Sequence, residues 1–327
     1  MEVCEGPFGA SANASGSAHL EQAVKDLGTL EGPALVFGGP YSNLQATQAL
    51  LARADQLGIS PSRIICTGDV VAYCADPEAT VSLIRRSEMA VVMGNCEESL
   101  GFGTDDCGCG FSEGSACDLL SVQWFAYARN HLSAAAKQWM RDLPRALSFR
   151  MADRRFRVVH GSVASINRFV FASTPLSEKE AEFELGDADA IIGGHCGLPF
   201  TQVIGDRLWH NAGVIGMPAN DGTPRVWFAL LTPEGSDVRI ETHSLQYDYG
   251  TAAEAMAAAG LPAAYAKTLG DGLWPNLDIL PETETAATGR PLSETTIVWH
   301  GNETGRSTMP RPAPEPVSES AYLRATK

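Results

Sequence analysis

The 327-residue sequence predicts an α/β protein in which two mixed β-sheets pack as a sandwich flanked by helices. Short apolar runs alternate with helical patterns in the first third of the chain, which is typical of parallel strands joined by helices. Closely spaced apolar runs follow in the second half, and they favour antiparallel hairpins in a second sheet. Hydrophobic residues make up 44% of the chain, which is enough for a sizeable core.

The first half of the chain carries the alternating pattern. A short amphipathic helix is expected over residues 17–30, because Leu20, Val24 and Leu27 are spaced for one helical face. Strands that end in glycine turns are expected at residues 34–37, 63–67 and 90–93, and helices at 43–57, 77–86, 117–131 and 133–142. A glycine- and acid-rich loop is expected over residues 97–116.

The second half is expected to contain strands at 156–159, 190–192, 201–204, 207–209, 225–231 and 237–243, then a helix over 254–269 interrupted at Gly260. We therefore expect an N-terminal extension (1–30), a main domain (31–245), a helical C-terminal extension (246–281) and a tail (282–327). The tail is rich in Pro, Thr, Ser, Glu and Gly, a composition that predicts disorder.

Composition excludes several classes of partner. The 24 Lys and Arg against 39 Asp and Glu give a net charge of −15, which argues against a nucleic-acid duplex or an anionic membrane. A phosphorylated small molecule stays compatible with this charge, because a bound metal reverses the local sign. No run approaches the ~20 apolar residues of a membrane span, and the N-terminus has no apolar signal region, so a cytoplasmic protein is expected. The oligomeric state is open.

Four motifs place polar side chains directly after apolar runs. They are GDVVAY at 68–73, GNCEE at 94–98, VVHGS at 158–162 and GGHCGLPF at 193–200. Because ligand-binding residues of such sheets follow the carboxyl ends of strands, four side chains are expected to converge: Asp69, Asn95, His160 and His195. A carboxylate, an amide oxygen and two imidazoles suit a divalent ion such as Mn, Fe or Zn.

In order and spacing, the four motifs resemble the calcineurin-like metallophosphoesterase superfamily, and its small bacterial phosphodiesterase-like branch, over residues 34–243. The resemblance implies a two-sheet fold and a two-metal phosphoesterase. It also implies that the four converging residues form one complete metal site. The first motif, Asp-x-His, is replaced by Gly39 and Tyr41, and Gly197 stands in place of the final His, so the other metal site is degenerate.

The expected function is therefore hydrolysis of a phosphomonoester or phosphodiester by a metal-bound water, with one conventional metal site and one divalent ion per chain. The same four residues are expected to be catalytic. Arg168, which follows the His160 motif, is a candidate contact to a substrate phosphate, and its alternative role is that of a solvated surface residue.

Cysteines and acids gather beside the expected site. The segment 97–118 has six acids, no Lys or Arg, and three of the eight cysteines. Candidate ligands of a rebuilt second site are Tyr41, Cys107, Cys109 and Cys196. The alternative for Cys107 and Cys109 is that they are reduced thiols or a redox pair. The alternative for Tyr41 is a packing role, in which its ring fills the vacated metal site. Two other functions stay open: a non-hydrolytic metal- or nucleotide-binding regulatory protein, and a Cys/Tyr metal centre with redox or metalloid chemistry.

Overall fold

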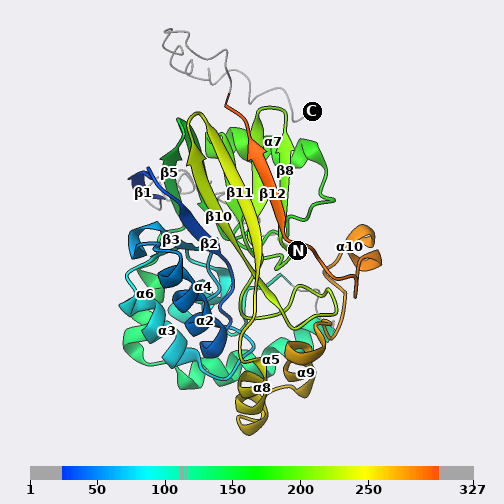
Figure 1. The fold of residues 1–327 in the computed structure, drawn as a ribbon. Helices are drawn as coiled ribbons and strands as arrows, with labels where there is room; N and C mark the ends of the chain where they lie inside the picture. Colours follow the sequence, from blue (N-terminus) through cyan, green and yellow to red (C-terminus); the bar gives the residue numbers. More distant parts are fainter. Residues whose placement is uncertain (1–23, 111–113, 115, 302–327) are drawn as a thin grey trace, which may run out of the picture.

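Two six-stranded mixed sheets stack face to face, and helices flank them, which confirms the predicted fold class (Figure 1). The computed structural model describes residues 24–110, 114 and 116–301, with the backbone alone for 116–118. The first sheet contains, in spatial order, β1 (Val24–Thr29), β5 (Ala146–Met151), β6 (Arg154–Val159), β7 (Ala190–Gly193), β9 (Arg207–Asn211) and β8 (Phe200–Ile204). The second contains β12 (Thr295–Trp299), β11 (Asp237–Leu245), β10 (Val226–Glu234), β2 (Ala34–Phe37), β3 (Ile64–Cys66) and β4 (Ala90–Val91).

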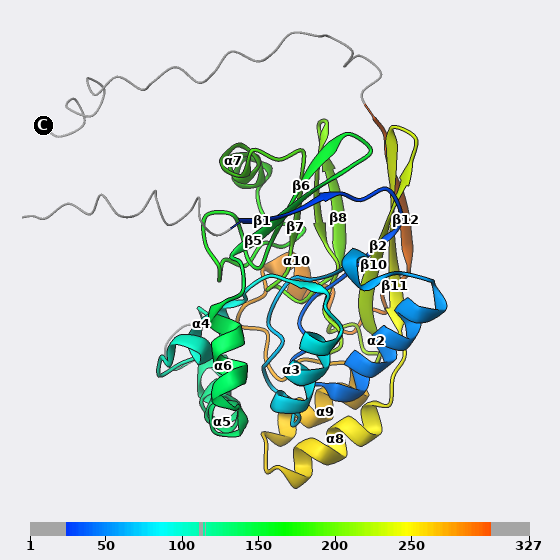
Figure 2. The ribbon, with the colours of Figure 1, turned by 90° about the vertical axis from the view of Figure 1, so that its left-hand side faces the viewer.

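Most of the described helices lie on one side of the sandwich and pack against the second sheet (Figure 2). They are α2 (Leu44–Gln56), α3 (Pro77–Arg86), α4 (Asn95–Phe102), α5 (Ala116–His131), α6 (Ala134–Arg141), α8 (Tyr249–Ala258) and α9 (Ala263–Asp271). Helix α7 (Leu176–Gly186) covers the outer face of the first sheet. The remaining elements are the 3₁₀ turn η1 (Pro61–Arg63) and α10 (Glu282–Ala286).

Strand β2 shows why its sequence is a continuous apolar run. Successive side chains of a strand point to opposite faces. Ala34 and Val36 therefore lie between the two sheets, whereas Leu35 and Phe37 pack against the helices. Both faces are buried, so no polar residue alternates with the apolar ones, as is usual for strands inside an α/β sandwich.

The N-terminal part of the described chain differs from its predicted structure. Residues 24–29 form β1, which runs parallel to β5, where a helix is expected. Val24 and Leu27 are three residues apart, a helical spacing, but in the strand they pack into different hydrophobic clusters. Pairing with β5, more than 100 residues away along the chain, overrides this weak local pattern. Residues 1–23 lie outside the described residues.

Several long-range pairings also depart from the prediction. The β10–β11 hairpin extends the sheet of β2, β3 and β4, and not the other sheet. Strand β5 and helix α7 have no counterpart in the predicted elements, and the expected loop over 97–116 begins inside α4. The composition predicts disorder from residue 282, but α10 and β12 lie there. Strand β12 pairs with β11 and buries Trp299 against the core. Residues 302–327 lie outside the described residues.

None of the helices within the described ranges combines the length and the apolar character that a membrane span requires.

Candidate metal centre

The four strand-end residues come together at the carboxyl ends of strands from both sheets. Asp69 follows β3, and Asn95 is the first residue of α4, shortly after β4. His160 directly follows β6, and His195 follows β7. All four side chains are buried. Each sheet thus contributes two residues to one cluster. The motif positions predict that the four side chains come together, but at the edge of one sheet and not between two.

Three other donor atoms of this cluster lie close to Nε2 of His160. This nitrogen lies 3.0 Å from Oδ1 of Asn95 and 3.0 Å from Nδ1 of His195. It also lies 3.3 Å from Oδ2 of Asp69. Nδ1 of His160 lies 2.7 Å from the Thr67 carbonyl oxygen and donates its proton there, so that neutral His160 presents a lone pair at Nε2.

These spacings fit a divalent ion. Two ligand atoms that bind one ion at right angles, each at about 2.1 Å, lie about 3.0 Å apart. The ligand atoms of Asp69, His160 and His195 all lie within 4.8 Å of one another. Oxygen and imidazole ligands together suit Mn, Fe or Zn. The residues present therefore fit the ion that the sequence predicts.

The electrostatics of the cluster favour a positive charge at its centre. Burial opposes charge on Asp69, but the neighbouring His160 outweighs it and lowers the pKa of Asp69. In turn, burial works against the charged form of His160, but Asp69 and the Thr67 carbonyl hold the pKa of His160 above its usual value. Burial and the charge of His160 lower the pKa of His195 to about 3. The Asp69 carboxylate that raises the pKa of His160 would also stabilise a cation bound among these side chains.

The backbone that presents the cluster is strained. Asp69 and His195 have φ of +54° and +60°, in the left-handed region that non-glycine residues rarely adopt. Gly94 leaves room for the carboxylate, because a Cβ at residue 94 would lie 2.3 Å from Oδ1 of Asp69. The Cys96 amide donates to the same oxygen at 3.2 Å. Strain of this kind persists where the surroundings fix one geometry, and it gathers at functional sites.

Asn95 is oriented by the segment that follows α4. Its Nδ2 donates to the Cys107 carbonyl oxygen at 2.9 Å and lies 3.4 Å from Sγ of Cys109, so that Oδ1 faces His160. Cys107 and Cys109 are joined by a disulfide. The sequence places both cysteines beside the expected site, but it does not show whether they are bonded to each other. The side chain of Cys117 lies outside the described residues.

Glu97 is a positioning residue, although its sequence context predicts only an acidic loop. Its side chain is completely buried, and Oε2 accepts the amide protons of Asp69 (2.8 Å) and Gly94 (3.0 Å). Oε1 accepts from the Val71 amide at 3.2 Å. Burial raises the pKa of Glu97 to about 7. Its place at the third position of α4, three residues after the N-cap Gly94, is the sequence signal that could have revealed this role.

Replacement of Glu97 by alanine is expected to lower the free energy of unfolding by about 3 kcal/mol, because three buried amides lose their acceptor. Urea-induced unfolding followed by circular dichroism measures the change. The matched control is Glu98→Ala, which removes a partly exposed ion pair with Arg145 and should cost less than about 1 kcal/mol. Equal losses in the two variants would contradict the assigned role of Glu97.

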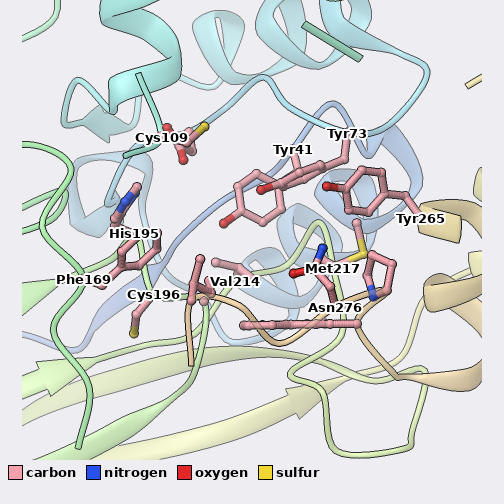
Figure 3. A pocket seen from close by; sticks show the side chains of 15 residues that line it. Tyr41, Tyr73, Cys109, Phe169, His195, Cys196, Val214, Met217, Tyr265 and Asn276 are labelled. Carbon is pink, nitrogen blue, oxygen red and sulfur yellow. The ribbon is translucent and has the colours of Figure 1, made fainter. Parts of the chain in front are cut away.

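A cavity adjoins the cluster, with His195 and Cys109 at one end and Tyr265 and Asn276 at the other (Figure 3). Tyr41 and Cys196 also line it. Burial raises the pKa of Tyr41 well above its ordinary value, so the phenol is neutral.

The Cys196 thiol receives a hydrogen bond from Nδ2 of Asn211 at 3.1 Å, and burial raises its pKa to about 12. Without a metal this side chain is therefore a thiol at neutral pH. Arg168 does not lie among the residues that line the cavity. Its guanidinium pairs with Glu178 and Glu182 of α7. The structure thus brings the tyrosine and the cysteine to the cavity but not the arginine.

Two stacked mixed sheets with a buried Asp/His/His group at the ends of their strands are typical of metallophosphoesterases. The calcineurin-like phosphoesterase superfamily domain matches residues 41–235, and the chain belongs to this superfamily. Members of the superfamily typically bind divalent metal ions, and Asp69, His160 and His195 form a group that could hold one.

Individual relatives support the same fold. A metallophosphoesterase from Sphaerobacter thermophilus has a TM-score of 0.59 at 22% identity, over 74% of this chain and 99% of that one. A hypothetical protein from Pyrococcus horikoshii has a TM-score of 0.63 at 18% identity, with the same coverage of 74% and 99%. An uncharacterized protein of Methanocaldococcus jannaschii is 24% identical over 245 residues, which are 68% of this chain and 90% of that protein.

Proposed function

We propose that the protein is a metal-dependent phosphoester hydrolase whose single divalent ion is held by Asp69, Asn95, His160 and His195. The observation that carries the proposal is the approach of three donor atoms to within 3.3 Å of Nε2 of His160, in a buried cluster that favours positive charge. The substrate is a phosphorylated small molecule, which agrees with the superfamily of the chain.

A single ion per chain is supported by the geometry around Gly39. The family resemblance places a metal-binding aspartate at this position. A Cβ at residue 39 would lie 2.5 Å from Cζ of Tyr41, so the tyrosine ring fills the volume that an aspartate side chain needs. Gly197, in place of the final histidine, has φ of +73° and lies against Trp274. The Gly39–Tyr41 pair therefore supports the proposal that packing has closed this position to a metal ion.

A divalent ion in this cluster supplies Lewis-acid chemistry, which makes a water more acidic and balances charge on the phosphate. The chain's own residues hold its ligands in place. The Cys107 carbonyl fixes the amide of Asn95, and the ring of Phe169 stacks on His195 with centroids 4.2 Å apart, shielding that ligand from solvent. In the overall reaction water adds to phosphorus, one P–O ester bond breaks, and the leaving oxygen departs with a proton.

The test is metal analysis of protein purified from its native host, combined with turnover of 4-nitrophenyl phosphate and bis(4-nitrophenyl) phosphate. We expect about one Mn, Fe or Zn per chain, and turnover that a chelator removes and the metal restores. Stoichiometric metal without turnover of any phosphoester would overturn the hydrolase proposal. That result would favour a regulatory metal- or nucleotide-binding role.

A second candidate function, a rebuilt metal centre with redox or metalloid chemistry, is favoured by the position of Cys109. Cys109 lines the cavity, and its Sγ lies 3.4 Å from Nδ2 of Asn95. A dithiol reductant would convert the Cys107–Cys109 disulfide into two thiols and become a disulfide itself. In reduced, Co²⁺-loaded protein this candidate predicts a thiolate charge-transfer band that Cys109→Ser abolishes. An identical spectrum in the serine variant would exclude the thiolate.

A further inference from the structure

The part of the cavity that lies beyond the four-residue cluster is walled by aromatic and apolar side chains. Tyr41, Tyr73 and Tyr265 face it together with Met217 (Figure 3). Trp274 lines the cavity as well. The cavity is continuous with the cluster, because Asp69 and His195 line it too. A molecule with its phosphate at the cluster therefore places its next group among these rings.

The tyrosines form an ordered aromatic array. The Tyr41 and Tyr73 ring centroids are 4.9 Å apart at an interplanar angle of 86°, and those of Tyr73 and Tyr265 are 4.7 Å apart at 48°. Trp274 is fixed by hydrogen bonds from its backbone amide to Asn220 (2.9 Å) and from Nε1 to the Pro218 carbonyl (2.7 Å). Rings held at such spacings accept a further planar ring at their faces or edges, at low cost in conformational entropy.

One wall of this cavity comes from outside the matched superfamily domain. That domain ends at residue 235, whereas Tyr265 lies on α9, and Trp274, Asn276 and Ile279 follow it. The C-terminal extension of this chain thus contributes a face of the cavity that the matched domain does not include. Residues of this wall would contact the part of the substrate that lies beyond the phosphate. They could therefore select among substrates without any change in the four-residue cluster.

The charge of the cavity limits the charge of the ligand. Among the described residues that line it there is no Lys or Arg, and Asp69 contributes one carboxylate. One divalent ion and this carboxylate leave a single net positive charge, which the one negative charge of a phosphodiester balances. A phosphomonoester dianion would keep a second charge without a cationic partner in a largely buried site, which is costly.

From the ring array and the charge we infer that the substrate is a phosphodiester that carries a planar aromatic group, with that group against Tyr73, Tyr265 and Trp274. This inference rests on the proposed hydrolase function. In the reaction the oxygen of water forms a bond to phosphorus, one P–O ester bond breaks, and the released alcohol or phenol takes the proton. The products are that alcohol or phenol and a phosphomonoester.

Non-hydrolysable ligands test the inference by binding alone. Isothermal titration calorimetry of the Mn²⁺-loaded full-length protein compares methylphenylphosphinate with ethylmethylphosphinate, two monoanions without an ester bond that differ in the ring. Phenylphosphonate provides the aromatic dianion. We expect the phenyl monoanion to bind about tenfold more tightly than either of the other two. Tyr265→Leu should abolish the preference for phenyl over ethyl, and Tyr265→Phe should retain it, because the ring and not the hydroxyl is responsible.

Tyr249→Leu is the matched control, since Tyr249 is 40% exposed and lies outside the cavity. Mn²⁺ stoichiometry and thermal unfolding verify that each variant is folded. Equal affinity for phenyl and ethyl monoanions, in protein that hydrolyses bis(4-nitrophenyl) phosphate, would overturn the aromatic inference and leave the hydrolase intact. A phenyl preference that Tyr265→Leu removes, in protein without phosphoesterase turnover, would support the aromatic site and contradict hydrolysis.

Discussion

Replacement of His195 by alanine is expected to lower metal-dependent turnover of bis(4-nitrophenyl) phosphate more than about 100-fold. Loss of a residue that merely supports a ligand already costs 10- to 100-fold in metal affinity or activity, and His195 is proposed as a ligand itself. Its ring nitrogen is one of the donors at 3.0 Å from Nε2 of His160. Steady-state kinetics at saturating Mn²⁺ and metal content after dialysis measure the two consequences.

The control for this variant is His243→Ala. His243 lies on β11, where its Nδ1 is 3.3 Å from a carboxylate oxygen of Glu294, and it is not among the residues lining the cavity. We expect this variant to keep both its metal and its turnover. A His195→Ala protein with unchanged metal content and unchanged kinetics would show that the cluster is held by hydrogen bonds alone and has no part in catalysis.

Gly39→Asp is expected to destabilise the fold by about 3 kcal/mol. The new Cβ would lie 2.5 Å from Cζ of Tyr41 and 2.8 Å from Cγ1 of Val214, so both buried side chains must move. The backbone there has φ of +39°, which adds strain for any residue with a Cβ. Urea-induced unfolding of the variant and the parent protein gives the difference in stability.

The compensating variant combines Gly39→Asp with Tyr41→His. It removes the phenol ring of residue 41 and adds a carboxylate and an imidazole. We expect it to recover part of the lost stability and to bind more Mn²⁺ per chain than the parent protein does. Recovery is partial, because residue 41 has φ of +51° and residue 39 keeps its own strain. If the single variant Gly39→Asp is as stable as the parent, the tyrosine ring does not block the position where the family resemblance implies an aspartate.

Strands β2, β3 and β4 and helices α2 and α3 were predictable, because they depend on local periodicity. The runs at β2, β3 and β4 are apolar, and a glycine follows each of them within a few residues. The approach of Asp69 to Asn95, and of His160 to His195, was predictable for a related reason. The members of each pair follow neighbouring parallel strands, β3 and β4 in one sheet and β6 and β7 in the other, whose carboxyl ends lie at the same edge of the sheet. The packing of the two sheets brings the two pairs together.

Other features of the site were hidden in the sequence. Glu97 is one of six acids in its segment, and its position three residues after Gly94 is a local signal for a capping role. That its carboxylate also accepts the amides of Asp69 and Val71 depends on the tertiary structure. Arg168 follows a site motif closely, yet α7 supplies the acids that pair with its side chain. Proximity in sequence to a motif does not decide in which direction a long side chain points.

The sequence by itself determined the fold class and placed the proposed donor set, Asp69, Asn95, His160 and His195, after strands. It also shows Gly39, Tyr41 and Gly197 at the positions where the family resemblance implies other residues. These follow from residue type and from position relative to a strand end. Only the tertiary structure decided which sheet the β10–β11 hairpin joins, that the Tyr41 ring fills the space above Gly39, and that the C-terminal extension walls the cavity. The physical reason is that these are packing contacts between residues far apart in the chain. A local sequence pattern does not indicate which distant residue a side chain will contact.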